Sequence, residues 1–82
     1  MFPVSGDEDA GAFLRAFGKR LRLARLDRGL TQEEFARLLG VHRTFYGALE
    51  RGDRGCNIAR LPDFCRALGV SVDALLPGER VP

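Results

Sequence analysis

Residues 31 to 50 read TQEEFARLLGVHRTFYGALE, and this segment constrains the fold of the chain more than any other. Thr31 followed three residues later by Glu34 is the pattern of a capping box, in which each side chain accepts a hydrogen bond from the other residue's backbone N–H. A helix is therefore expected to begin at Gln32. We expect Gly40 to end it, because glycine adopts a positive φ without a clash from a Cβ atom.

A second short helix follows almost at once. Val41 occupies the corner, and the helical spacing of apolar residues continues over about residues 43–51 before Gly52 ends it. The two helices share an inward apolar side, which consists of Phe35, Ala36, Leu39, Tyr46 and Leu49. A turn of three or four residues sets two short helices near a right angle, so that the second one projects from the body of the domain.

A projecting helix of this kind fits the DNA major groove, which is about 12 Å wide, while its partner crosses the phosphates. Its outward face consists of Arg43, Thr44, Gly47, Ala48 and Arg51. Arg43 is placed to donate two hydrogen bonds to a guanine, a contact worth about 1–3 kcal/mol of discrimination, and Thr44 can contact a base edge or a thymine methyl. Gly47 costs about 0.5–1 kcal/mol relative to alanine in a helix interior. Either close backbone approach to the groove wall or drift at a tolerant surface position would explain it.

The chain before this segment predicts one longer helix. Apolar residues recur at spacings of four and three over about residues 10–28, and Gly29 supplies the stop. The expected inward residues are Phe13, Phe17, Leu21 and Ala24, with Arg15, Lys19 and Arg22 outside. Residues 1–9 are expected to form a flexible arm.

The chain after the segment predicts two more short helices. Asn57 can cap a helix over about residues 58–67, but Pro62 favours a later start near Leu61, because proline suits the first helical turn. Ser71 caps a short fifth helix that runs through Leu76, and residues 77–82 are expected to form a tail. Five short helices without an alternating strand pattern predict an all-α, compact five-helix bundle, and 82 residues leave room for one domain, 1–82.

Charge is unevenly distributed along the chain, although the net charge is only +2. Residues 1–14 hold three acids and no base, whereas residues 15–60 hold eleven bases and five acids. Almost all the bases are arginine, whose planar fork suits phosphates and guanine edges. The basic middle block is therefore a modest indication of nucleic-acid binding.

Several classes of function find no support in the sequence. No stretch approaches the roughly 18 apolar residues of a membrane span, and the N-terminal residues lack the pattern of a signal peptide, so we expect a cytoplasmic chain. Cys56 and Cys65 lack zinc-ligand spacing; Cys65 fits a reduced core position, and Cys56 lies in a glycine-rich loop without an assigned role. No group is placed to form a catalytic site with His42. We expect no enzyme activity, metal, cofactor or small-molecule ligand.

From residue 17 to residue 76 the sequence resembles the Cro and phage-repressor family of helix-turn-helix proteins, the XRE type with a lambda-repressor-like fold. The resemblance is carried by Gln32, Ala36, Gly40, Glu50 and Gly52. The run RTFYGALERG is also similar to the controller proteins of restriction-modification systems. Two residues depart from the family pattern. Tyr46 replaces a usual Ile or Val, so its hydroxyl is expected to find a hydrogen-bond partner or to tilt to the rim. His42 takes an N-cap place that serine commonly holds.

The resemblance implies a structural ion pair between Arg25 and Glu50 that orients the reading helix. The residues expected to contact DNA bases are Arg43, Thr44, Ala48 and His42. Helix N-termini suit phosphates, and arginines around the loop after the reading helix would hold the same backbone. The expected phosphate contacts are Thr31, Gln32, Arg51, Arg54 and Asn57.

These features favour a sequence-specific transcriptional regulator that binds double-stranded DNA at an inverted repeat as a homodimer. We expect the dimer surface among the C-terminal apolar residues, several of which must also serve the core; these residues are Val70, Val72, Leu75, Leu76 and Val81. The alternative is a protein-interaction module, such as an antitoxin-like or accessory partner with the same fold. The basic face that carries Arg43 favours DNA, since a pure interaction module does not need it.

Overall fold

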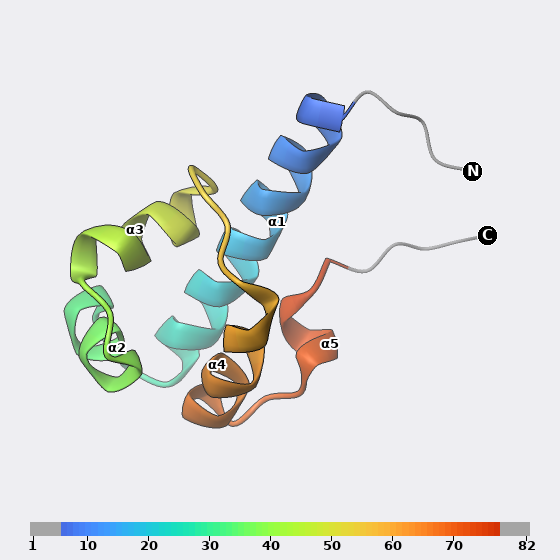
Figure 1. The fold of residues 1–82 in the computed structure, drawn as a ribbon. Helices are drawn as coiled ribbons and strands as arrows, with labels where there is room; N and C mark the ends of the chain where they lie inside the picture. The colour runs from blue at the N-terminus through green and yellow to red at the C-terminus, as the bar shows by residue number, and fades with distance from the viewer. Residues whose placement is uncertain (1–5, 78–82) are drawn as a thin grey trace.

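The computed structural model describes residues 6–77, with side chains from residue 10 onward. Helix α1 (Gly6–Asp27) is the longest element, and in Figure 1 its N-terminal end projects beyond the other helices. It begins at Gly6 rather than near Ala10, so residues 6–9 of the expected arm are helical. The rest of that arm, residues 1–5, and the tail beyond Pro77 lie outside the described residues.

Helices α2 (Gln32–Leu39) and α3 (Arg43–Arg51) confirm the expected bounds of the central pair. The capping box is present: Thr31 Oγ1 accepts from the N–H of Glu34 at 3.0 Å, and Glu34 Oε1 accepts from the N–H of Thr31 at 2.8 Å. Gly40 ends α2 with a φ of 74°, a left-handed conformation that favours glycine. The short turn between these helices therefore follows from local sequence.

A loop and a single 3-10 turn, Ile58–Arg60, separate α3 from α4 (Leu61–Leu68). Asn57 caps the 3-10 turn, since its Oδ1 accepts from the N–H of Ala59 at 2.9 Å. The later of the two expected starts for α4 is confirmed, and Pro62 lies in its first turn. The last helix, α5 (Val72–Leu75), ends one residue before the expected Leu76.

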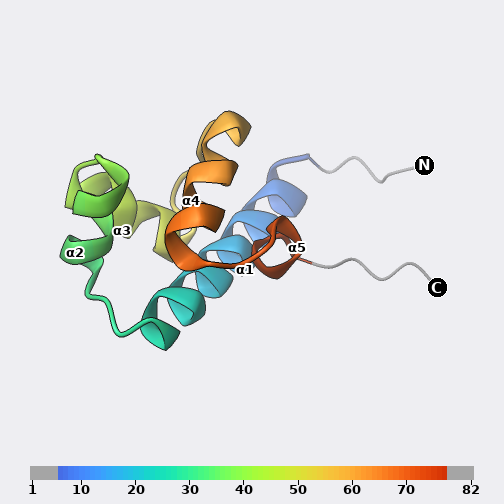
Figure 2. The ribbon, with the colours of Figure 1, turned by 90° about the horizontal axis from the view of Figure 1, so that it is seen from below.

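The five α-helices of residues 6–77 enclose one apolar core, and these residues include no strand. In Figure 2, α2 and α3 lie together at one end of the molecule, while α5 packs on α1. Phe35 lies edge-on to Tyr46, with ring centroids 5.2 Å apart, and it also contacts Phe64 of α4. The all-α fold class is confirmed. The fully buried core residues are Phe35, Tyr46, Leu21, Leu49, Phe64, Leu68 and Leu75.

Several expectations about burial were wrong. Phe13 is 46 % exposed, because α1 extends past the helices that cover its later turns. Leu75 is fully buried, so it is one of the C-terminal apolar residues that serve the core rather than the expected dimer surface, while Val81 lies outside the described residues. Gly47 lies on the same side of α3 as Arg43 and Arg51, as expected, but it is buried, because the side chains of Arg51 and Gln32 cover it. Cys56 is half-buried against the core, and this burial raises the pKa of its thiol.

Gly18 fixes how closely α1 crosses the end of α3. A Cβ atom at this position would overlap the backbone carbonyl oxygens of Leu49 and Glu50. Gly52 ends α3 with a φ of 79°, and a Cβ atom there would overlap the backbone of Arg15 in α1. Two glycines therefore let the long helix hold the C-terminal end of α3 directly.

Candidate nucleic-acid interface

A polar hollow of about 410 Å³ lies between the start of α2 and the exposed side of α3. Its lining joins residues expected to contact phosphates with residues expected to contact bases: Thr31, Gln32, Glu33, Arg43, Thr44, Gly47 and Arg51. Arg43 and Thr44 are exposed in the first turn of α3. The fold thus brings two stretches of the sequence together on one surface, which we call the polar hollow.

The N-terminus of α2 forms one side of the polar hollow. The capping box uses the N–H groups of Thr31 and Glu34, whereas those of Gln32 and Glu33 belong to the first turn, where a helix offers no acceptor. Such N–H groups and the positive end of the helix dipole favour anions. The carboxylates of Glu33 and Glu34 oppose this preference, so an anion here needs further cations.

The N-terminus of α3 is capped by His42. Its Nδ1 accepts from the N–H of Thr44 at 3.0 Å. Only a neutral imidazole with its proton on Nε2 can accept at Nδ1, which leaves Nε2–H as a donor on the exposed side of the ring. His42 therefore fills the N-cap place in which the family usually has serine, and it adds a donor beside Arg43.

The polar hollow is held in place from beneath by an ion pair. Arg25 of α1 and Glu50 of α3 are both almost fully buried, and Arg25 Nε lies 2.6 Å from Glu50 Oε2. Arg25 also donates to the carbonyl oxygen of Leu30 at 2.7 Å, and Gln32 Nε2 donates to Glu50 Oε1 at 2.9 Å. One carboxylate therefore connects α1, α2 and α3.

The surroundings of Glu50 lower the pKa of its carboxyl group. Burial alone would raise the pKa of this carboxyl, but hydrogen bonds from Arg25 and Gln32 outweigh burial and hold the pKa below its usual range. The same contact with Glu50 raises the pKa of Arg25. Both groups stay charged at neutral pH.

Tyr46 sits beside this ion pair without joining it. Its side chain is fully buried, yet its hydroxyl has no hydrogen-bond partner among the residues that the structure describes. Burial raises the pKa of Tyr46 above its usual range, and the nearby Glu50 carboxylate adds to the effect. We expected the phenol to find a partner or to tilt to the rim, and it does neither. Its ring packs edge-on against Phe35 in the core.

Arg51 at the C-terminal end of α3 and Arg54 in the following loop contact different partners. Arg51 Nε lies 2.8 Å from Asp53 Oδ2, and both side chains are more than half exposed. The guanidinium of Arg54 lies over the ring of Phe45, 4.5 Å from its centroid. Arg51 lines the polar hollow, whereas Arg54 and Asn57 do not. Asn57 uses its Oδ1 as a cap, so only its amide NH₂ remains to donate.

Three features of this region were not expected from the sequence. The guanidinium of Arg54 packs on the ring of Phe45. The side-chain amide of Gln32 donates to Glu50 beneath the hollow. The side chains of Gln32 and Arg51 cover Gly47. Ala48 is half-buried rather than fully outward. The close crossing at Gly18 did leave a signal, because an isolated glycine inside a helical pattern costs about 1 kcal/mol relative to alanine and therefore suggests a packing reason.

Other kinds of site find no support in the described residues. No three of their His, Cys, Asp or Glu side chains are grouped to hold a metal ion. Between residues 6 and 77, no helix combines the length and the apolar character needed to cross a membrane.

The chain matches known proteins over most of its length. A family model described as a helix-turn-helix domain matches residues 16–77. The HTH-type transcriptional regulator YazB of Bacillus subtilis is 39 % identical over 64 residues, which cover 78 % of this chain and 93 % of YazB. The restriction-modification controller protein C.AhdI from Aeromonas hydrophila superimposes with a TM-score of 0.74 at 37 % identity, over 79 % of this chain and 98 % of C.AhdI.

A third relative has been solved in complex with DNA. SinR, described as the master regulator for biofilm formation, superimposes with a TM-score of 0.67 at 28 % identity, over 72 % of this chain and 95 % of that one. These relatives are DNA-binding regulators rather than enzymes. The family match and the geometry of α2 and α3 agree, and the chain belongs to the helix-turn-helix family of transcriptional regulators, of the Cro and phage-repressor type.

Proposed function

We propose that this chain binds an inverted-repeat DNA operator as a dimer, with α3 in the major groove of each half-site. The observation that carries the proposal is the polar hollow, because it joins the N-terminus of α2 to Arg43 and Thr44 on one open surface. In helix-turn-helix docking the first helix crosses the backbone while the second reads bases. A single surface can therefore hold a phosphate and a base edge together.

The base contacts are assigned to the exposed start of α3. Arg43 would donate to O6 and N7 of a guanine, and Thr44 would bond a base edge or contact a thymine methyl. His42 would donate from Nε2, since its Nδ1 is occupied by the cap. Ala48 offers only a methyl group for contact with thymine. Most of the sequence discrimination then depends on Arg43 and Thr44.

The phosphate contacts are assigned to the two ends of the helix pair. Gln32 would donate its backbone N–H at the start of α2, and Thr31 would donate its side-chain hydroxyl, because the capping box occupies its N–H. Arg51 would exchange its exposed ion pair with Asp53 for a phosphate, and Arg54 would reach the backbone from its place on Phe45. Asn57 would donate through its amide. Exposed ion pairs are worth about 0–1 kcal/mol, so this exchange costs little.

The chain would regulate transcription by occupying promoter DNA in the cytoplasm. A protein bound at a promoter excludes or recruits polymerase, and the position of its operator decides which. The rival function is a protein-interaction module with the same fold. The exposed Arg43 beside the polar hollow favours DNA over this rival.

The test is a fluorescence-anisotropy titration on DNA upstream of the chain's own gene, located by footprinting. Arg43→Ala should weaken specific binding by about tenfold to a hundredfold and relax selectivity at one base pair. Arg51→Ala and Arg54→Ala should weaken binding to all sequences and lower the slope of log Kd against log salt by about 0.9 each.

Arg66→Ala is the matched control, because Arg66 is an exposed arginine on α4 that pairs with Asp63. It removes the same charge away from the polar hollow and should leave binding nearly unchanged. Equal losses in Arg43→Ala and Arg66→Ala would refute the assignment of α3 and leave only a general effect of charge.

A further inference from the structure

One arginine beside α3 is held by an aromatic ring. The guanidinium carbon of Arg54 lies over the ring of Phe45, 4.5 Å from its centroid. We propose that Phe45 is a positioning residue for DNA binding, whose ring holds Arg54 so that the N–H groups of Arg54 meet a phosphate on the groove wall away from α2. This inference rests on the proposed function, because it needs α3 to lie in the major groove.

The way in which Arg54 is held is the first argument. A ring attracts a guanidinium through its face, and the N–H donors lie in the plane of the guanidinium. Arg51 and Arg25 instead use their Nε atoms on Asp53 and Glu50. Among residues 10–77, no ion pair or hydrogen bond engages the N–H groups of Arg54. A bidentate phosphate contact needs two such donors side by side, and Arg54 keeps them.

The place of Phe45 on α3 is the second argument. Successive helical residues advance about 100° around the axis. Arg43 and Gly47 lie on the side of α3 that faces α2, since both line the polar hollow. Thr44 follows at about 100° from Arg43 and Phe45 at about 200°, so Phe45 lies on the other edge of the exposed surface. With α3 in a major groove, α2 and Arg54 would approach the phosphates of opposite walls.

The difference in burial between the two side chains is the third argument. Phe45 is partly buried and packs against the core, whereas Arg54 is exposed. An exposed arginine samples many rotamers and loses this freedom when it binds. Contact with a ring that the core holds in place removes part of that freedom beforehand, which raises affinity. A phosphate carries no sequence information, so the gain should apply to every DNA sequence.

The experiment is a double-mutant cycle, measured by fluorescence anisotropy on the operator and on an unrelated duplex. Phe45→Leu keeps an apolar side chain against the core and removes the ring. It should raise Kd on both duplexes by about threefold to tenfold, and Arg54→Ala should raise it at least as much. In a chain that already carries Arg54→Ala, adding Phe45→Leu should change Kd by less than about twofold, because the ring acts only through Arg54.

A role of Phe45 in packing alone predicts another outcome of this cycle. The losses from Phe45→Leu and Arg54→Ala would then multiply, and the base preference at Arg43 would change with the pose of α3. Either result would overturn the proposal. Phe45→Tyr keeps the ring and should bind DNA as the wild type does. A loss in Phe45→Tyr equal to that in Phe45→Leu would count against the ring as well.

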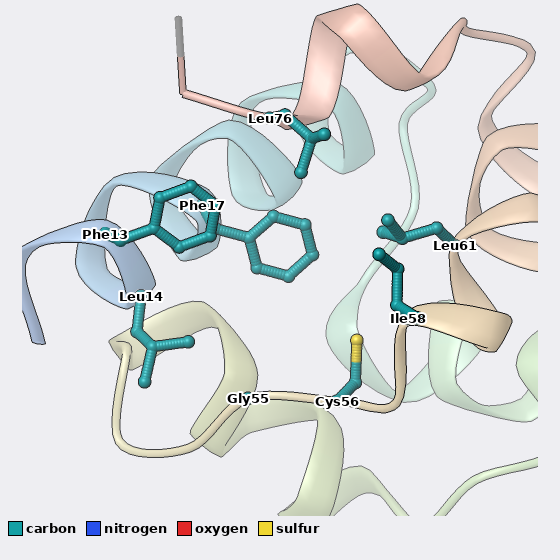
Figure 3. A pocket seen from close by; sticks show the side chains of 8 residues that line it. All are labelled: Phe13, Leu14, Phe17, Gly55, Cys56, Ile58, Leu61 and Leu76. Atoms are coloured by element: carbon teal, nitrogen blue, oxygen red, sulfur yellow. The ribbon is translucent and has the colours of Figure 1, made fainter. Parts of the chain in front are cut away.

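Phe13→Leu is the matched control, because Phe13 is a 46 % exposed phenylalanine of α1. It lines a second concave surface of about 270 Å³, which we call the apolar groove and which shares no lining residue with the polar hollow. Figure 3 shows the side chains that converge there, among them Phe13, Leu14, Cys56, Ile58 and Leu76. Phe13→Leu should leave Kd nearly unchanged. Equal losses in Phe13→Leu and Phe45→Leu would reduce the effect to the loss of any aromatic ring and overturn the assignment.

Proton NMR of the chain without DNA measures the contact itself. The ring current of Phe45 should shift the δ-methylene protons of Arg54 upfield of those of Arg66, which pairs with Asp63. The shift should disappear in Phe45→Leu, whose helical content is checked by circular dichroism. Equal resonance positions for Arg54 and Arg66 in the wild type would overturn the proposal, even if Phe45→Leu did not fold.

The same titrations separate this inference from the proposed function. If the wild type binds its inverted repeat and the two losses multiply, the proposed function stands and Phe45 is not a positioning residue. If the wild type binds no DNA, the proposed function fails and the role of Phe45 in DNA binding fails with it.

Discussion

The polar hollow and the apolar groove are two concave surfaces of comparable size with opposite chemistry. The polar hollow lies between two helices whose ends are capped by side chains, and the buried pair of Arg25 and Glu50 holds it from beneath. The apolar groove lies where α1 extends past the body and meets a loop. The first surface is fixed by local sequence signals, whereas the second results from how distant parts of the chain pack.

Breaking the ion pair should have the largest effect on the polar hollow. Glu50→Gln removes the charge that compensates Arg25 and weakens the contact that holds Gln32. Loss of one partner of a buried pair costs about 3–5 kcal/mol, because the other charge remains buried. Urea denaturation measures the change in the free energy of unfolding.

The control for this change is Asp63→Asn, which breaks the exposed pair of Asp63 with Arg66. We expect a loss below about 1 kcal/mol there. Similar losses in the two variants would show that the Arg25–Glu50 contact does not hold the helices together.

Filling the crossing between α1 and α3 should have the next largest effect. Gly18→Ala places a methyl group against the backbone carbonyls of Leu49 and Glu50, which cannot move without displacing α3. Overpacking of this kind costs about 1–3 kcal/mol, and DNA affinity should fall with the shift of α3. Thermal denaturation and the anisotropy titration measure both losses.

Gly11→Ala tests whether the loss comes from the crossing rather than from the helix itself. A Cβ at Gly11 meets only the end of the Arg15 side chain, which can move aside. This variant should gain about 0.5–1 kcal/mol from better helix propensity. If Gly18→Ala were equally stabilising, the close crossing would be wrong.

Lowering the pH should destabilise the fold beneath the polar hollow, because it protonates Glu50. Its pKa is lower in the folded chain than in the unfolded chain, so the unfolded chain takes up a proton first as the pH falls. The stability that this carboxylate provides is complete above the unfolded value of about 4.3 and is lost as the pH falls through the folded pKa. The difference in unfolding free energy between the wild type and Glu50→Gln should therefore shrink below about pH 4. A difference that stays constant down to the lowest accessible pH would contradict the assignment.

The smallest expected effect comes from Gly47→Ala, which also decides between the two explanations of that glycine. An added Cβ would lie 3.3 Å from Arg51 Nη1 and 3.5 Å from Gln32 Oε1, both at the ends of flexible side chains. We expect a gain of about 0.5 kcal/mol in stability and little change in DNA affinity. A tenfold loss of affinity in a stabilised variant would instead indicate close approach of the α3 backbone to DNA.

The sequence predicted the polar hollow better than the apolar groove for a physical reason. Capping boxes and stop glycines act between residues that are neighbours in the chain, so the bounds of α2 and α3 follow from Thr31, Glu34 and Gly40. Helical periodicity identified an apolar face on α1, but whether Phe13 is covered depends on where the last helices pack. The same limit explains why the sequence left open which of the C-terminal apolar residues serve the core, as Leu75 does.

In vitro selection from a library of random duplex DNA tests the central claim most directly. The wild type should enrich an inverted repeat whose half-sites lie about 10–10.5 base pairs apart, or a multiple of this spacing, with a guanine preferred at one position of each half. Arg43→Ala should lose the preference at that position and keep the rest of the repeat. Absence of any enriched sequence, or an identical repeat with both proteins, would contradict the assignment of α3 as the reading helix.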